Sequence, residues 1–347
     1  IVIRGNTPAF LLWRLEGVEI PNPNHFAMEG TTGGPVGMLN NNTLSNSDFF
    51  TGAFPAEFGN ALSGVFDLQM RSGNNEQFEF LGQTGFNGFE LGVEGPLNKR
   101  NGSSFLANYR YSTLDIMNKL GMDFGTVGIP KYQDFSSKIT WPTKSGRIEL
   151  FTLWGTSEIA ILDSEDEDDL YNQGGVDLYN GSTVGATGLS YLFFHNQNTF
   201  SRISASGFYQ RTSTDIYELE ENGSYLDIDD NYKEKKATLS YELTHKFNSK
   251  HSIKSGLAYD RIAFNLNGRY FDEDENQFFP YFDNNLKISD GPNYIKTFTQ
   301  WKYKYTDDLT LNSGLHFSYF DLNKSKSLEP RIGLNYDVSP TQSVSIA

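Results

Sequence analysis

The chain has 347 residues, with 43 acidic against 28 basic side chains and a formal net charge of −15 at pH 7. A protein that neutralises nucleic-acid phosphates needs a basic face, so this balance argues against a nucleic-acid partner. Aromatic residues make up 15% of the chain, glycine is abundant and the mean hydropathy is −0.49. Such a composition predicts an all-β or mostly β protein with many turns, and it argues against disorder.

No segment approaches the roughly 18 consecutive apolar residues that a membrane-spanning helix needs, which excludes a helical membrane protein. A closed β-barrel is then the remaining way to cross a bilayer, because closure satisfies every backbone polar group. The absence of cysteine fits an envelope protein without disulfides, although many cytosolic proteins share it. The opening "IVIRGN" is typical of the middle of a strand, so we expect the true N-terminus to lie upstream.

Residues 1–74 lack long alternating strands, whereas the chain becomes periodic from about residue 76. In 237–247 the odd-numbered positions are mainly apolar and the even-numbered ones polar, and 309–319 and 328–337 alternate in the same way. Period two predicts strands with one apolar face. Several of these runs reach about ten residues, enough for a tilted strand to cross a bilayer, whereas strands of soluble sandwiches are usually nearer five or six.

The connections between these strands alternate in length. Short turns are predicted at 96–104, 142–146, 196–199, 248–251, 305–308 and 338–342. Long polar connections are predicted at about 112–132, 158–180, 214–233 and 267–292, with a shorter one near 321–326. Outer-membrane barrels have this layout, with periplasmic turns and extracellular loops, whereas a soluble sandwich, the alternative, has no reason to sort its loops. Apolar positions would then face lipid and polar positions the lumen.

Residues near the N-terminus carry a family resemblance. They are Ile3-Arg4-Gly5, Leu15-Glu16-Gly17-Val18 and the run "FPAEFGNALSGVFDLQMRSG", and far downstream "LEPRIGLNYDVSPTQSVSIA" continues the likeness. With these segments the chain resembles the TonB-dependent outer-membrane receptors, particularly those of the Bacteroidetes type. The resemblance implies that residues 1–74 are the C-terminal part of an α/β plug. Residues 75–347 would be the N-terminal part of an antiparallel transmembrane β-barrel around it.

Barrels of this family have 22 strands, and the sequence offers about thirteen strand-like segments, so we expect an incomplete barrel. The resemblance implies a receptor in the outer membrane that imports a scarce ligand: a siderophore, a cofactor, a glycan or a peptide. Its partners would be outer-membrane lipid and lipopolysaccharide, the ligand, TonB, whose contact segment this sequence lacks, and other outer-membrane subunits. A structural, assembly or secretion component of an outer-membrane complex is the alternative, since fold does not fix function.

No catalytic, cofactor or metal site is predicted. The five histidines are scattered without zinc-ligand spacing. The acidic runs at 163–169, 218–230 and 272–276 lack the spacing of an EF-hand loop, so they would at most attract divalent ions loosely. An outer-membrane enzyme is a further alternative, which would need a Ser or Asp beside a His at a strand end.

Two sets of residues are candidates for a site. Asn22, Asn24, His25 and Phe26 of "PNPNHF" would offer hydrogen bonds and a stacking face to a ligand, unless the two prolines simply fix a turn. The second set follows from the resemblance: Arg4 and Arg71 resemble plug arginines that pair with barrel glutamates, and Glu329, which has lumen parity, is one candidate partner. His316 also has lumen parity and is a weaker candidate for ligand contact.

Overall fold

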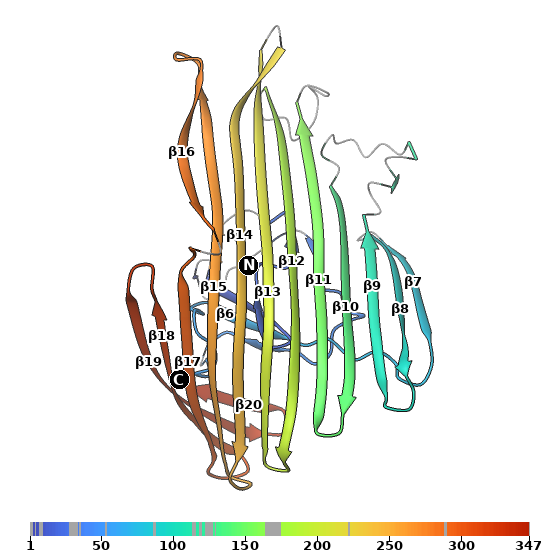
Figure 1. Ribbon diagram of the computed structural model, residues 1–347, viewed down its shortest axis with the longest axis vertical. Coiled ribbons are helices and arrows are strands. Elements are labelled where there is room, and N and C mark those ends of the chain that lie inside the picture. The colour runs from blue at the N-terminus through green and yellow to red at the C-terminus, as the bar shows by residue number, and fades with distance from the viewer. Residues whose placement is uncertain are drawn as a thin grey trace.

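Figure 1 shows the fold in a computed structural model of the chain. It describes residues 3, 5–6, 10–27, 34, 36–52, 54–85, 88–112, 116–117, 120–121, 128, 130–163, 175–220, 223–287 and 290–346. These residues form a sheet of four strands, a sheet of two and a sheet of fourteen. Strand pairs are antiparallel apart from β1 and β6, which run parallel. The chain is therefore all-β, as predicted.

The inner domain, as the term is used below, comprises the described residues among 3–74, and it contains six short strands. They are β1 (Leu11–Leu15), β2 (Val18–Ile20), β3 (Asn24–His25), β4 (Val36–Gly37), β5 (Asp48–Phe50) and β6 (Gly64–Leu68). The four-stranded sheet has the order β2-β1-β6-β5, and β3 pairs with β4. The described residues of this domain form strands and turns, so the helical part of the expected α/β plug is not among them.

The turn between β1 and β2 consists of Glu16 and Gly17, whose φ angles are 54° and 80°. Two consecutive positive φ values are the geometry of a type I′ hairpin. Glycine adopts this geometry freely, but glutamate rarely does. The Glu16 carboxylate is held in place because Oε1 accepts hydrogen bonds from the Met70 N–H at 2.6 Å and from Lys138 Nζ at 2.9 Å. This strained turn places the Glu16 carboxylate within hydrogen-bond distance of Lys138 in the large sheet.

The fourteen-stranded sheet is called the wall below. Its strands are β7 (Glu79–Gly85), β8 (Gly88–Asn98), β9 (Ser103–Tyr111), β10 (Lys131–Thr143), β11 (Gly146–Leu162), β12 (Val176–Asn196), β13 (Thr199–Glu220), β14 (Gly223–Lys246), β15 (His251–Asp272), β16 (Gln277–Leu286), β17 (Asn293–Lys304), β18 (Leu309–Phe320), β19 (Ser325–Ser339) and β20 (Gln342–Ile346). Consecutive strands are neighbours, except that β15 pairs with β17 along 251–261 and with β16 along 264–272. All six predicted short turns are confirmed, and Figure 1 shows turns of this kind gathered at its lower end.

Three of the predicted long connections are wrong in part, because the strands continue into them. β11 runs to Leu162 and β12 starts at Val176, β13 and β14 extend to Glu220 and from Gly223, and β15 runs to Asp272. A strand with water on both faces needs no apolar parity, since its neighbours satisfy its backbone hydrogen bonds. β14 is 24 residues long, more than twice what a tilted crossing needs. The acidic run 218–230 thus lies mostly in strands. Of the run 163–169, residues 164–169 fall outside the described residues.

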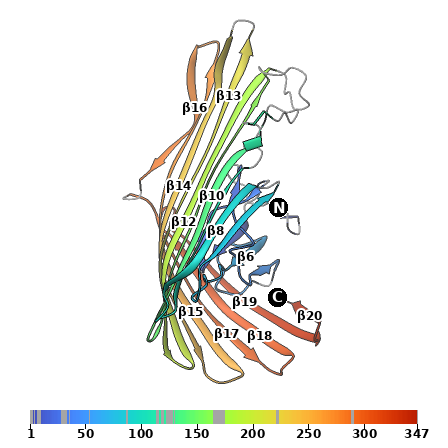
Figure 2. The same cartoon turned by 90° about the vertical axis from the view of Figure 1, so that its right-hand side faces the viewer.

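The two faces of the wall have the predicted parity. Leu239, Leu315 and Leu334 are 54%, 40% and 43% exposed on the outer face. Neighbouring residues of opposite parity, such as His316, are buried against the inner domain, which Figure 2 shows on the concave side of the wall. Two face-packed sheets with these leucines between them are therefore excluded. In the described part of the chain, no helix has the length and hydropathy of a membrane span.

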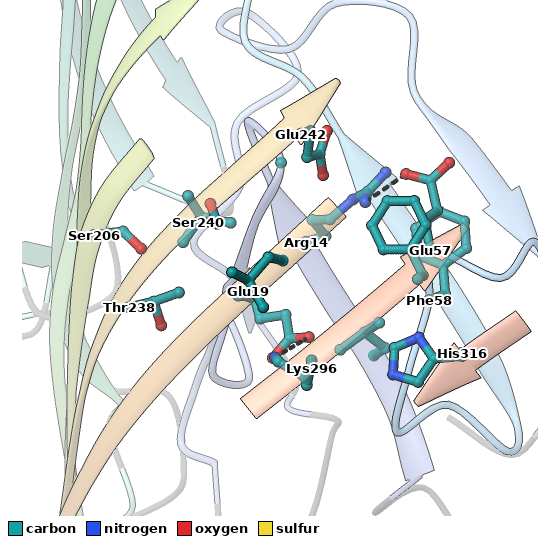
Figure 3. A pocket seen from close by; sticks show the side chains of 16 residues that line it. Arg14, Glu19, Glu57, Phe58, Ser206, Thr238, Ser240, Glu242, Lys296 and His316 are labelled. Carbon is teal, nitrogen blue, oxygen red and sulfur yellow. Dashed lines mark hydrogen bonds and ion pairs between the residues drawn. The ribbon is translucent and has the colours of Figure 1, made fainter. Parts of the chain in front are cut away.

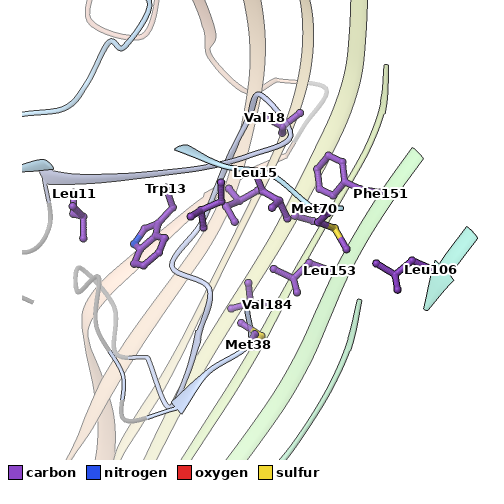
Figure 4. Packing of buried hydrophobic residues seen from close by; sticks show 13 residues of the cluster. Leu11, Trp13, Leu15, Val18, Met38, Met70, Leu106, Phe151, Leu153 and Val184 are labelled. Atoms are coloured by element: carbon purple, nitrogen blue, oxygen red, sulfur yellow. The ribbon is translucent and has the colours of Figure 1, made fainter. Parts of the chain in front are cut away.

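The main apolar core joins the inner domain to one part of the wall. Leu15, Met38 and Met70 of the inner domain pack with Leu153 and Val184 of β11 and β12, as Figure 4 shows. Inward positions of a polar barrel lumen are usually polar. Here they are apolar because the inner domain, and not water, covers them.

Candidate functional site

A buried ion-pair network joins β2 to the wall. Glu19 contacts Lys296 Nζ at 2.8 Å and Lys236 Nζ at 3.1 Å, and Lys296 also contacts Asp260 at 3.0 Å. Two lysines and two carboxylates cancel in charge, as buried ionised groups require. Burial alone would raise the pKa of Glu19, but the charges of the two lysines hold that pKa well below its ordinary value. Glu19 is therefore ionised at neutral pH, and it fixes β2 against β14 and β17.

A second network is built around Glu57, which lies in the turns before β6. Its Oε2 accepts hydrogen bonds from Arg14 at 2.9 Å and from Lys254 at 2.6 Å. Arg14 also donates from Nε and Nη2 to both oxygens of Asp67, at 2.7 and 2.5 Å. Burial by itself would raise the pKa of Glu57, but the charges of Arg14 and Lys254 outweigh it and lower the pKa to about 2. The pair Arg14–Asp67 holds β1 to β6. Lys254 of β15 binds Glu57 and so links the inner domain to the wall.

A third network lies at the β1–β2 turn. Lys138 of β10 donates to Glu16 and to the Met70 carbonyl, both at 2.9 Å, and contacts Glu149 at 3.4 Å. Arg202 of β13 donates to the Glu16 carbonyl at 3.1 Å. In each of the three networks a carboxylate of the inner domain, Glu19, Glu57 or Glu16, contacts a lysine of the wall. Buried pairs of this kind specify a position more reliably than they stabilise it.

A cavity of about 70 Å³ lies between the inner domain and the wall, next to the first two networks. Figure 3 shows Arg14, Glu19, Glu57, Lys296 and His316 around it. Pockets for small-molecule ligands are usually about 300–1,000 Å³. This cavity therefore has room for a few water molecules beside the charges, but not for an imported ligand.

His316 contacts the inner domain directly. Its Nδ1 donates to the Ala56 carbonyl at 2.8 Å, and its ring covers Gly59, where an added Cβ would lie 2.5 Å from Nε2. The side chain is 2% exposed. Only glycine fits beneath this ring, so His316 and Gly59 form a close contact between β18 and the inner domain.

The four predicted ligand residues lie beside β10 and β11. His25 is 1% exposed, with Nε2 at 2.9 Å from Asp134, and the Phe26 N–H donates to Ser157 Oγ at 2.9 Å. Asn24 donates to Asn22 Oδ1 at 2.6 Å. Burial lowers the pKa of His25, partly opposed by Asp134. The structure thus brings the four together on the side of the inner domain that faces β10 and β11. Ligand contact through them stays a prediction.

Arg4, Arg71 and Glu329, which were predicted to seat the plug in the barrel by ion pairs, have different surroundings. Arg4 lies outside the described residues. Arg71 forms a bidentate pair with Glu94 of β8, with both distances 2.6 Å. Glu329 pairs instead with Arg331 on its own strand at 2.6 Å, and Arg331 donates to three carbonyls of the inner domain, those of Phe54, Pro55 and Phe58. A seating role for these residues stays a prediction.

Sequence reasoning missed most of the residues that form the ion-pair networks between the inner domain and the wall. These are Arg14, Glu16, Glu19, Glu57, Lys138, Lys236, Lys254 and Lys296. The available signal was a charged residue at an inward position, such as Lys296 within "YIKTF". That signal does not say which carboxylate of the inner domain such a lysine meets. Among the described residues, no group of three or more His, Cys, Asp or Glu side chains is placed to hold a metal ion.

No family model and no curated protein matches the chain. Solved structures do match it. The siderophore receptor PirA from Acinetobacter baumannii matches over 98% of this chain and 53% of its own, with a TM-score of 0.63 and 15% sequence identity. The pyoverdine outer membrane receptor FpvA from Pseudomonas aeruginosa PAO1, bound to pyoverdine, matches over 98% and 55%, with a TM-score of 0.65 and 14% identity. The outer membrane transporter YddB from Escherichia coli matches over 97% and 52%, with a TM-score of 0.62 and 12% identity.

These matches define the class of fold. The chain has the β-barrel fold of outer-membrane receptors and transporters, with an inner domain on the concave side of the wall. It spans about half the length of the solved structures that it matches.

Proposed function

We propose that the chain is part of a TonB-dependent receptor of the outer membrane, in which the inner domain acts as a plug. The observation that carries this proposal is the pairing of carboxylates Glu16, Glu19 and Glu57 with cations of the wall. A covalently continuous domain seated by ion pairs blocks passage, yet it can be released without breaking an apolar core on that side. The likeness in fold to receptors and transporters supports the proposal.

The imported ligand is proposed to be a ferric siderophore, because two of the similar proteins are named as receptors for a siderophore or for pyoverdine. A vitamin-like cofactor, a glycan and a peptide are the other classes to compare. The ligand would bind above the inner domain, towards the long hairpins β13–β14 and β15–β16, since the cavity of about 70 Å³ beneath is too small for it. No chemical step is assigned to the protein.

The test is uptake of ⁵⁵Fe-labelled siderophores by cells that carry the full-length gene, its deletion, or the gene in a host without TonB. We expect uptake of at least one siderophore to fall to background in the deletion strain and in the host without TonB. Uptake that survives the loss of TonB overturns the coupling. The same strains are then compared for uptake of a labelled vitamin-like cofactor, a glycan and a peptide. If the deletion leaves the uptake of all four ligand classes unchanged but removes a component of an outer-membrane complex, the protein is a structural or assembly component instead.

A further inference from the structure

The outer face of the wall carries a row of exposed aromatic side chains. In the strand register, Phe135 lies opposite Trp154, which lies opposite Gly185, which lies opposite Tyr209. The Trp154 and Tyr209 rings stack across the glycine, with centroids 6.1 Å apart. A Cβ at Gly185 would lie 2.1 Å from the Trp154 ring, so glycine lets the two rings meet. Rows of this kind lie at the level of the lipid headgroups in membrane barrels.

A polar hollow of about 450 Å³ lies directly above this row, on the side of the long hairpins. Register places the outward residues of the next rows side by side, since Gln133 lies opposite Thr156, Thr156 opposite Thr183 and Thr183 opposite Arg211. The polar side chains that line the hollow include Lys131, Gln133, Thr156, Thr183, Arg211 and Ser213. Its size and lining suit a sugar-sized polar headgroup.

Basic side chains are concentrated at one edge of the hollow. Arg211 of β13 lies directly opposite Lys233 of β14, and Lys235 lies two positions along the same face, 5.6 Å from the Tyr209 ring centroid. Like charges directly opposite each other destabilise a strand pair. Within the described part of the chain, no hydrogen bond or close ion pair of Arg211 or Lys233 is found, although the charge of Arg211 does act on the Asp215 carboxylate four residues along β13. An anion between Arg211 and Lys233 would offset the repulsion between the two side chains.

Carboxylates on the same face are placed differently. Glu158 lies opposite Lys131, 3.8 Å from it, at the other edge of the hollow. Asp229 lies further along β14, towards the hairpin and opposite Asp215 of β13, and it pairs with Arg269 at 2.6 Å. The positive charge is therefore next to the aromatic row, at headgroup level, and the negative charge lies mainly beyond it.

We propose that this hollow binds the headgroup of a phosphorylated glycolipid of the outer leaflet, with a phosphate between Arg211 and Lys233. The inference rests on the proposed location in the outer membrane. Threonine and amide groups of the hollow would contact sugar hydroxyls, and the acyl chains would lie below, along apolar outward residues such as Leu150 and Leu189. A lipid is favoured over a soluble anion because the hollow adjoins the aromatic row and the apolar face without interruption.

The test uses the purified full-length protein in detergent and native mass spectrometry, which counts bound lipids. Bisphosphorylated lipid A is titrated against its dephosphorylated form. We expect the wild type to prefer the phosphorylated form by about thirtyfold, as two basic residues at a membrane surface provide. The double variant R211Q/K233Q is expected to lose this preference. The matched control K250Q/K304Q removes two lysines near the short turn between β14 and β15 and is expected to keep it.

Equal binding of both lipid forms by the wild type, or an unchanged preference in R211Q/K233Q, overturns the proposal. The proposal is also overturned if millimolar inorganic phosphate abolishes the preference, because the site would then bind free anions. The exchange R211K/K233R keeps both charges and is expected to keep the preference, which separates loss of charge from misfolding. Siderophore uptake by R211Q/K233Q stays at the wild-type level if both proposals hold, because these residues lie on the outer face. Loss of uptake in the deletion strain is judged separately and bears only on the proposed function.

Discussion

The inner domain meets two parts of the wall by different means. Towards β9–β12 it buries Leu15, Met38 and Met70 against apolar residues of the wall such as Leu153. Towards β14–β18 it places carboxylates against lysines, with a water-sized cavity between them. Apolar contact depends on buried area and is largely indifferent to pH and salt, whereas ion pairs are directional and depend on charge. The first part holds the domain, and the second sets its position and can be released by neutralising a charge.

The largest effect is expected from Lys296→Met. The substitution leaves the buried Asp260 without its lysine and Glu19 with only one, so it should lower the free energy of unfolding by about 3–5 kcal/mol. Denaturant titration in detergent measures this, and protease cleavage of the inner domain should accelerate. Lys302→Met on the same strand, an exposed position, is the control. Equal stability of the two variants would contradict the role of the network.

Leu153→Ala tests the apolar part. Leu153 is 1% exposed, so truncation leaves a cavity and should cost about 2–5 kcal/mol at any pH between 4 and 8. The outward Leu150→Ala on the same strand is the control and should cost much less in detergent. A cost that changes with pH would show that the two parts of the interface are not separate.

The charged part should weaken in acid through Glu57. Its pKa falls from an ordinary 4.5 to about 2 on folding, so its contribution is complete above pH 4.5 and is lost as the pH falls towards 2. The loss should be on the order of 2–3 kcal/mol. Protease cleavage of the inner domain, measured from pH 6 to pH 3, should rise in the wild type. Glu57→Gln, which cannot ionise, should lose this part of the pH dependence; a profile like that of the wild type would refute the assignment.

The polar contact between His25 and Asp134, next to the apolar core, should have a separate and smaller pH dependence. Burial lowers its pKa below the ordinary 6.5, while Asp134 opposes the shift and Arg110 adds to it. A lowered pKa means that the contribution is complete above pH 6.5 and weakens as the pH falls below that value. The protection of β3 and β10 against hydrogen exchange, corrected for the intrinsic rate at each pH, should therefore fall between pH 7 and pH 5, before the region around Glu57 responds. His25→Gln should remove this early phase.

The smallest effect is expected from Glu329→Ala. Glu329 orients Arg331, which donates to carbonyls of the inner domain, but its side chain is 35% exposed and solvent screens the pair. A cost below about 1 kcal/mol is expected, with slightly faster protease nicking and raised antibiotic leakage in cells. Ser327→Ala, which removes the other hydrogen-bond partner of Glu329, is the control. Wild-type values in both assays for Glu329→Ala would count against a seating role.

Much of the wall could be predicted from local sequence. Alternation placed Leu239, Leu315 and Leu334 on the outer face, and the polar turns between strands were found at the right positions. The extent of the upper hairpins was missed, since successive residues at the end of β13 and the start of β14 are all at least partly exposed, which removes the alternation that marks a strand. The backbone ladder continues there because each strand still has a neighbour.

The candidate site was less accessible to sequence reasoning. Arg71 was singled out and does pair with a glutamate of the wall, Glu94, but Glu329 was the partner considered. His25 was considered for its possible contact with a ligand, and its burial between the inner domain and β10 has no local signal.

The sequence by itself determined which side chains face outward and which face inward, because successive residues of a strand point to opposite sides whatever the strand contacts. The tertiary structure decided what the inward side chains meet. Glu19 and Lys296 are distant in the chain, and only the curvature of the wall around the inner domain brings their charges within 2.8 Å. Energies of such contacts depend on position in three dimensions, which residue type and spacing do not contain.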